Sequence, residues 1–151
     1  MPVLPKILVV EDDEAIRTLL VAALRREPFD VHSAANGAEA LGLTRATEYA
    51  VILLDLMMPA LNGVEFLEAF HEAAPESRTV IFVMTAFDDA MVHHVAPNLV
   101  HAIVRKPFDV PQLVAMVREV GLTRQECLPE GTSEVDLSEA GAEALPAEPP
   151  N

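Results

Sequence analysis

Short apolar segments alternate with amphipathic segments along most of the chain. The apolar segments are rich in β-branched residues and bounded by turn residues, a pattern typical of strands buried on both faces. They are Lys6–Val10, Phe29–Ala34, Ala50–Leu54, Thr79–Met84 and Val100–Val104. Apolar residues recur at helical spacing in Glu14–Arg26, Ala38–Thr47, Val64–Ala74, Asp88–Ala96 and Val110–Val120. The alternation predicts an α/β fold: a doubly wound five-stranded parallel sheet with helices on both faces.

Two of these segments carry further signals. Phe29–Ala34 is a weaker strand pattern than the others, which favours a place towards an edge of the sheet. The last helix follows Asp109, a good capping residue, and has Pro111 in its first turn. It is predicted to end before Gly121.

The character of the chain changes at Leu122. Residues 122–151 hold seven acidic residues and one basic residue, with prolines crowding the end. Such a segment cannot bury enough apolar surface to offset its conformational entropy, so it is predicted to be largely disordered. The predicted organisation is one folded domain over residues 1–121, followed by an acidic Pro/Ala/Glu-rich tail over residues 122–151.

The composition narrows the class of protein. Of the 151 residues, 51% are apolar, but no run approaches the roughly 20 residues that span a bilayer. The single cysteine, Cys127, favours a reducing compartment, so a cytoplasmic location is expected. The formal net charge of −14 argues against direct nucleic-acid binding and is compatible with basic protein partners.

Acidic side chains follow two of the predicted buried strands. Asp55 ends the third apolar segment, and the acidic run Glu11–Glu14 ends the first. A buried carboxylate costs several kcal/mol unless a cation or hydrogen bonds compensate. Because ligands of open α/β sheets bind at the carboxyl ends of the strands, these acids are expected to share one site. Clustered carboxylates without cysteine describe a hard-cation site, best suited to Mg²⁺.

Four motifs, each closing a predicted strand, resemble those of receiver domains of two-component response regulators. They are Val9–Asp13, Asp55–Gly63, Thr85-Ala86 and Lys106-Pro107-Phe108. The resemblance covers about residues 5–121 and implies a flavodoxin-like sheet with strand order 2-1-3-4-5. It also implies a chain that works as a stand-alone signalling domain of the chemotaxis-regulator type and is not an enzyme.

The resemblance implies a role for each member of the acidic cluster. Asp55 would be the phosphoacceptor, taking a phosphoryl group from a sensor histidine kinase or a histidine phosphotransfer protein. Mg²⁺ would be bound directly by Asp12, by Asp55 and by the backbone carbonyl of Met57, and through water by Glu11.

The resemblance also implies how the signal leaves the site. Lys106 would pair with Asp55 and then with the phosphoryl group, and the hydroxyl of Thr85 would bind a phosphoryl oxygen. The resulting movement would change the surface offered to a downstream protein effector. A phosphorylation-dependent homodimer is a further possibility that the family raises.

Three positions depart from the family pattern. Ile103 stands where an aromatic switch residue is usual, and Pro97-Asn98 stands where Gly-Ala is frequent. Met57 and Phe87 lie two residues beyond Asp55 and Thr85, beside the path of the hydrolysing water. Our hypothesis is that these bulky apolar groups slow spontaneous dephosphorylation.

Other interpretations remain open at this point. The chain could be a receiver fragment of a longer regulator, with the tail as a linker. It could be a phosphohydrolase with an aspartate nucleophile, although that class needs an acid two residues after Asp55, where Met57 stands. A flavin-binding fold would need a phosphate-cradling loop where Glu11 and Asp12 lie. A non-phosphorylated pseudo-receiver would usually have lost one of the site residues.

Overall fold

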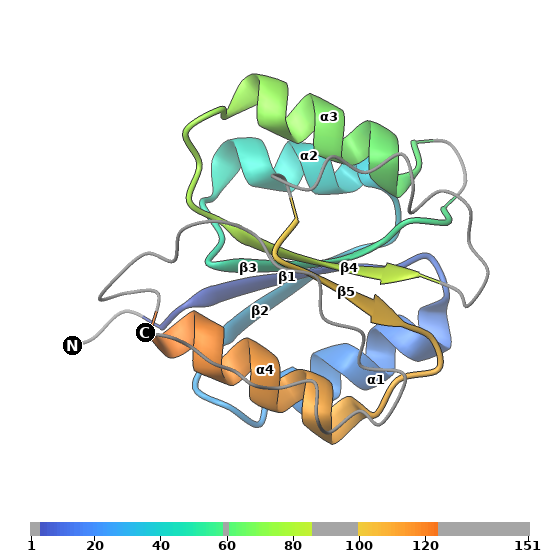
Figure 1. The fold of residues 1–151 in the computed structure, drawn as a ribbon, viewed down its shortest axis with the longest axis vertical. Helices are drawn as coiled ribbons and strands as arrows, with labels where there is room; N and C mark the ends of the chain where they lie inside the picture. Colours follow the sequence, from blue (N-terminus) through green and yellow to red (C-terminus); the bar gives the residue numbers. More distant parts are fainter. Residues whose placement is uncertain (1–3, 59–60, 86–99, 124–151) are drawn as a thin grey trace.

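The computed structural model describes residues 4–58, 61–85 and 100–123. Within them lies a five-stranded parallel sheet with the order β2-β1-β3-β4-β5, so the predicted fold class and strand order are confirmed (Figure 1). The strands are β1 (Lys6–Val10), β2 (Asp30–Ala34), β3 (Val51–Asp55), β4 (Val80–Thr85) and β5 (Ala102–Arg105). The weak second strand lies at an edge, as its composition predicts.

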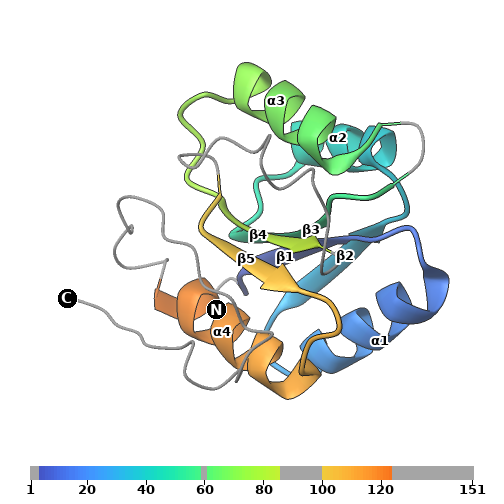
Figure 2. The ribbon, with the colours of Figure 1, turned by 45° about the vertical axis from the view of Figure 1, so that its right-hand side comes forward.

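Helices cover both faces of the sheet. The described helices are α1 (Glu14–Leu24), α2 (Gly37–Ala46), α3 (Gly63–Ala73) and α4 (Val110–Thr123). In both ribbon views α1 and α4 lie on one face, and α2 and α3 lie on the other (Figures 1 and 2). The helix expected over residues 88–96 and most of the tail expected over residues 122–151 lie outside the described residues.

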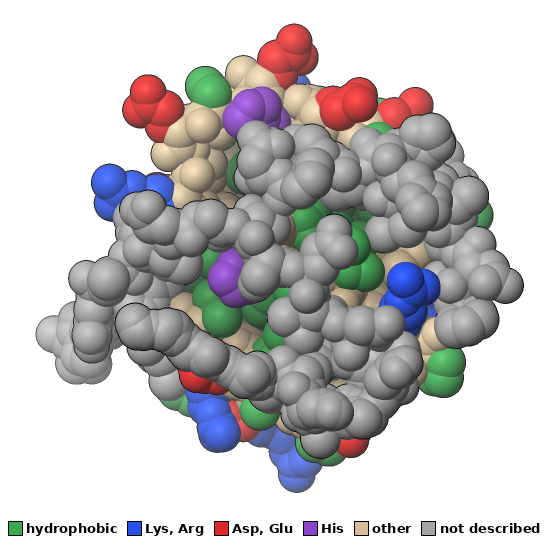
Figure 3. All heavy atoms as spheres, viewed as in Figure 1, with side chains coloured by type: hydrophobic (Ala, Val, Ile, Leu, Met, Phe, Trp, Pro, Cys, Tyr) green, Lys and Arg blue, Asp and Glu red, His purple; other side chains and the backbone are tan. Residues whose placement is uncertain are grey.

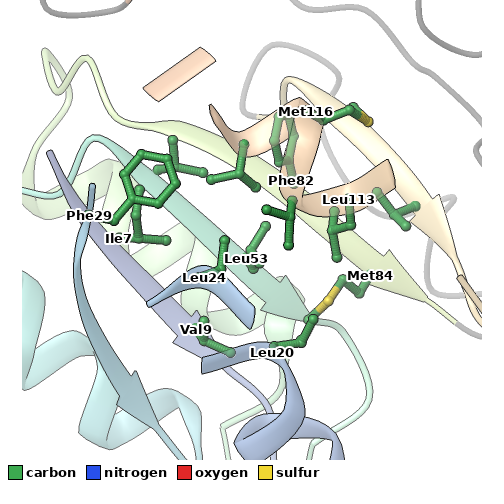
Figure 4. Close-up of a cluster of buried hydrophobic side chains, with 14 of the residues drawn as sticks. Ile7, Val9, Leu20, Leu24, Phe29, Leu53, Phe82, Met84, Leu113 and Met116 are labelled. Carbon is green, nitrogen blue, oxygen red and sulfur yellow. The ribbon is translucent and has the colours of Figure 1, made fainter. Parts of the chain in front are cut away.

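The alternation of side chains along the strands produces two apolar cores. On one face, Val9, Leu53 and Phe82 pack with residues of α1 and α4, among them Leu20 and Leu113 (Figure 4). On the other face, the neighbouring strand residues pack with α2 and α3. The members of that second cluster include Leu8, Val10, Ile52, Leu54, Phe66 and Leu67. The three central strands are therefore buried on both faces, which is why their sequences read as continuous apolar runs.

The last helix is longer than predicted. The N–H of Gln112 donates to Oδ1 of Asp109 at 3.4 Å, in agreement with Asp109 as a cap, but the helix continues through Gly121 to Thr123. A Cβ on Gly121 would lie 3.2 Å from the Phe29 ring. Glycine is used here for close packing between α4 and the segment before β2, and not to end the helix.

One helix has a strongly acidic outer surface. Acidic side chains gather on the outer side of α3 (Figure 3), where Glu65, Glu68 and Glu72 are all exposed. None of the helices in the described ranges is long and apolar enough to cross a membrane.

Candidate functional site

The carboxyl ends of the strands bring the predicted site residues together. In the parallel register, Val10 of β1 lies beside Leu54 of β3, and Asp55 lies beside Met84 of β4. Thr85, the next residue of β4, lies beside Arg105 at the end of β5. Residues that immediately follow β1 and β5 are therefore neighbours of Asp55, as the sequence predicts.

Asp55 is a buried carboxyl group that contacts both a backbone N–H and an ammonium group. Its side chain is 3% exposed. Oδ1 accepts a hydrogen bond from the backbone N–H of Met57 at 3.1 Å, and Oδ2 lies 3.4 Å from Nζ of Lys106. These two contacts fix the direction of the carboxyl plane, with one oxygen turned to the backbone and the other to the ammonium group.

Lys106 joins two of the acids. Its ammonium group lies 3.1 Å from Oε1 of Glu11 as well as 3.4 Å from Asp55. The backbone N–H of Lys106 donates to the carbonyl of Thr85 at 2.7 Å, which attaches the residue to the end of β4. Burial lowers the pKa of Lys106, but the carboxylates of Asp55 and Glu11 outweigh that effect and raise it above its ordinary value. Lys106 is therefore a charged ammonium group at neutral pH.

Glu11 is held on its backbone and on its side chain. Its backbone N–H donates to the carbonyl of Ala34 at 3.1 Å, and Oε2 accepts the N–H of Asp13 at 3.2 Å. The guanidinium of Arg17 on α1 donates to the Glu11 carbonyl at 2.8 Å. Sequence reasoning missed Arg17, because a basic residue on the first helix looks like an ordinary surface residue.

The acids form a group that fits a divalent cation. Carboxylate oxygens of Glu11, Asp12 and Asp55 lie within 4.8 Å of one another, and Asp12 is exposed while the other two are buried. Hard oxygen ligands open to water on one side are what Mg²⁺ prefers. Burial and then the charge of Glu11 raise the pKa of Asp55 to about 7, against a smaller lowering by Lys106. In the absence of a metal, the cluster thus carries more negative charge than its own lysine can balance.

The remaining predicted residues surround this group. Thr85 is fully buried at the end of β4, and the Met57 side chain is 53% exposed beside Asp55. Ile103 is half-buried and packs against the core beneath α2 and α3. Phe87 and the Pro97-Asn98 pair lie outside the described residues.

Comparison with known proteins agrees with this arrangement. The family model of the response regulator receiver domain matches residues 7–118. The transcriptional regulatory protein SrrA of Staphylococcus aureus is 42% identical over 81 residues, which are 54% of this chain and 32% of SrrA. The match thus spans about a third of the length of that curated relative.

Solved structures are similar over most of the chain. Chemotaxis protein CheY4 of Vibrio cholerae is 26% identical with a TM-score of 0.70, over 78% of this chain and 99% of that one. A CheY-like receiver domain protein of Methanospirillum hungatei is 25% identical with a TM-score of 0.73, over 83% and 100%.

Proposed function

Because the chain belongs to the family of response regulator receiver domains, we propose that Asp55 is the residue on which it accepts a phosphoryl group. A receiver domain is a signalling domain of two-component systems. The observation that supports the assignment is the environment of Asp55, which is buried, faces the ammonium group of Lys106 and belongs to the acidic cluster. Glu11 is also buried and bound to Lys106, but Asp55 stands nearer the middle of the sheet edge, at the end of β3.

The donor is a phosphohistidine of a sensor histidine kinase or a histidine phosphotransfer protein. A carboxylate oxygen of Asp55 attacks phosphorus, a P–O bond forms, and the P–N bond to the donor imidazole breaks. The leaving imidazole keeps the electron pair of that bond and takes up a proton. The reaction needs positioning and charge compensation above all, and the contacts of Asp55 with Met57 and Lys106 provide the positioning.

The acidic cluster is assigned to Mg²⁺. Asp12 and Asp55 would bind it directly with the backbone carbonyl of Met57, and Glu11 would bind through water. When bound, the ion compensates the negative charge of both the carboxylates and the phosphoryl oxygens. The protein's own contribution is to hold Glu11 by its backbone and Asp55 by its side chain, so that the oxygens converge before any ligand arrives.

Lys106 and Thr85 carry the change to the rest of the molecule. Phosphorylation replaces the single charge of Asp55 by about two, which gives Lys106 and the hydroxyl of Thr85 a new acceptor. Their backbones are joined by the 2.7 Å hydrogen bond from Lys106 to Thr85, so both respond together. The output is a shift in population between two conformations whose surfaces a downstream protein effector distinguishes. Formation of a homodimer is one consequence that can be measured.

The same site serves a cytoplasmic stand-alone receiver or a receiver that is part of a longer regulator. The partial coverage of SrrA fits the second alternative. In neither case do the described residues offer the acid two positions after Asp55 that an aspartate-dependent phosphohydrolase requires, because Met57 has no proton to give.

The direct test uses Mg²⁺ and acetyl phosphate, with the intact mass measured before and after. We expect the mass to rise by one phosphoryl group in the native protein and not in Asp55→Asn. Asp13→Asn is the matched control. Asp13 caps α1 through Oδ1, which lies 3.1 Å from the N–H of Ile16, and its side chain is not part of the acidic cluster.

Two results would contradict the assignment. One is a phosphoryl group that is still added to Asp55→Asn, which would place the acceptor elsewhere. The other is continuous turnover of a phosphomonoester by the native protein, which would identify a hydrolase and not a receiver.

A further inference from the structure

The first residue of α2 lies against the backbone that leads into α3. A Cβ on Gly37 would stand 2.5 Å from the carbonyl oxygen of Leu61 and 3.1 Å from its Cβ. Real Cβ atoms do not approach other atoms so closely, so any side chain at this position forces a shift of about half an ångström or more. The bare Cα of Gly37 is therefore what allows α2 and the Leu61 segment to touch.

A second glycine continues this contact towards Asp55. A Cβ on Gly63, the first residue of α3, would lie 2.6 Å from Cα of Leu56 and 2.7 Å from the carbonyl oxygen of Asp55. The N–H of Gly63 donates to the carbonyl of Leu56 at 3.0 Å. The start of α3 therefore packs directly against the backbone of Asp55 and Leu56.

The residue between these two contacts is rigidly held. Asn62 caps α3 through a reciprocal pair of hydrogen bonds with Glu65: the Glu65 N–H donates to Oδ1 of Asn62 at 2.9 Å, and the Asn62 N–H donates to Oε1 of Glu65 at 3.0 Å. A capping box of this kind fixes the direction in which the chain enters the helix. A displacement of Leu61 is therefore passed on to Gly63 and is not absorbed between them.

The α2 side of the contact is fixed as well. Asn36 caps α2, with Oδ1 at 2.8 Å from the N–H of Glu39, and Oε1 of Glu39 accepts the N–H of Ala35 at 2.9 Å. The preceding residue, Ala34, is bound through its carbonyl to the N–H of Glu11. Because α2 begins on the same backbone that holds Glu11, a clash at Gly37 is expected to move the Leu61 side.

We propose that Gly37 is a positioning residue for the Asp55 site. It acts through Leu61 and Gly63 on the Asp55–Met57 backbone, and so sets the distance between the Asp55 carboxylate and the groups it must meet, Asp12 and Lys106. The inference rests on the proposed function, because it gives α2 a part in the Mg²⁺ and phosphoryl chemistry. It predicts that a substitution remote from every charged group of the cluster weakens that chemistry.

The experiment compares two glycines of the same helix. A Cβ on Gly42 of α2 would meet nothing within 4 Å, so Gly42→Ala is a control for the change in helix propensity alone. For Gly37→Ala we expect several-fold weaker Mg²⁺ binding by isothermal titration calorimetry. Phosphorylation of Asp55 by acetyl phosphate should be about tenfold slower, since misplacement by 1 Å can cost about a hundredfold. Gly42→Ala should leave both quantities unchanged and raise Tm.

A merely structural role gives a different result. Gly37→Ala would then lower Tm while the folded protein kept the native Mg²⁺ affinity and phosphorylation rate, and the proposal would be overturned. If Gly37→Ala folds poorly, the measurements are made on Gly37→Ala combined with Gly42→Ala. A double variant that still does not fold would show that Gly37 serves the whole fold, which also overturns the proposal.

Relief of the contact provides a further check. Leu61→Gly removes the side-chain atoms that a Cβ on Gly37 would meet at 3.0 and 3.1 Å, and it gives the Leu61 carbonyl more freedom to turn away. Gly37→Ala should therefore have a smaller effect on Mg²⁺ affinity in that background. Failure of the native protein to gain a phosphoryl group would count against the proposed function alone. The Mg²⁺ titrations of the glycine variants would still decide the role of Gly37.

Discussion

The two ends of the sheet hold charged side chains in opposite ways. At the carboxyl end, the carboxylates of Glu11, Asp12 and Asp55 share the ammonium group of Lys106, and two of the three are buried. At the amino end, polar side chains pair among themselves. Lys6 lies 3.6 Å from Asp30, His32 lies 3.4 Å from Asp30, and Nδ1 of His32 lies 2.6 Å from the hydroxyl of Tyr49.

The two ends differ in how strongly their charged side chains are expected to interact. Lys6 and Asp30 have side chains that are 35% and 44% exposed, so water screens their charges and the pair contributes little to stability. Asp55 and Glu11 are shielded from water, so their repulsion is felt and a cation from outside has a large effect. We expect substitutions of the same kind to have very different consequences at the two ends.

The largest contrast is expected for the two lysines. Lys106→Met leaves the buried carboxylates of Asp55 and Glu11 without their ammonium partner, which should lower the free energy of unfolding by about 3 kcal/mol at pH 8 without metal. Lys6→Met removes an exposed ion pair and should cost less than about 0.5 kcal/mol. Urea denaturation of both variants measures the difference. Equal losses would show that the carboxyl end is no more sensitive to charge than the amino end.

A smaller effect of opposite sign is expected for Asp55→Asn. The folded protein raises the pKa of Asp55 to about 7, mainly by burial, whereas the unfolded chain has the ordinary value of 3.8. Between these two values the folded state binds more protons than the unfolded state, so the stability of the metal-free protein falls as the pH rises through that window. Asparagine does not ionise, so the variant escapes the loss.

The measurement is urea denaturation in a chelator at pH 5 and pH 8. Relative to the native protein, Asp55→Asn should gain about 2 kcal/mol between pH 5 and pH 8. Glu68→Gln on α3 is the control for the loss of an exposed acidic side chain. A native protein that is as stable at pH 8 as at pH 5, with no difference in Asp55→Asn, would contradict the environment assigned to Asp55.

Added Mg²⁺ should restore part of the stability that repulsion between the buried carboxylates removes. A ligand that binds only the folded state stabilises it, by about 1.4 kcal/mol at a concentration ten times Kd. Because binding requires the ionised carboxyl group, the rise in Tm should be larger at pH 8 than at pH 5. Asp12→Asn should reduce it, while Asp30→Asn should not. Thermal unfolding with and without Mg²⁺ tests this, and a rise in Tm that is insensitive to Asp12 would place the ion elsewhere.

The carboxyl end is also the part that the sequence predicts best. Asp55 stands out because it closes an apolar run, and parallel strands bring such ends to one edge, so a local pattern is enough to place Asp55, Glu11 and Lys106 together. The strand order and the helix-on-both-faces layout follow in the same way from alternation of elements and from the family resemblance.

Contacts between residues that are far apart in the sequence could not be predicted. The hydrogen bond from Arg17 to the Glu11 carbonyl and the approach of Gly37 to Leu61 depend on how helices settle on the sheet, and nothing in the local sequence marks them. The position of Gly121 inside α4 differs from the prediction for the same reason. A glycine near a helix end is most often a terminator, and only the position of the Phe29 ring explains why this one lies inside α4.

The last expected effect lies at the amino end and concerns a hydrogen bond, not a charge. Tyr49 is 1% exposed, and burial raises the pKa of its hydroxyl group. His32→Phe keeps an aromatic ring beside Tyr49, where the two rings now meet edge to face, but removes the 2.6 Å hydrogen bond. The loss should be about 1 kcal/mol, the typical net contribution of one such bond.

In the Tyr49→Phe background, where the hydroxyl is already absent, the same substitution should cost much less. A double-mutant cycle measured by urea denaturation gives the coupling directly. Additive losses would mean that the hydrogen bond between His32 and Tyr49 does not stabilise the amino end. The two ends of the sheet would then differ only in how exposed their polar side chains are.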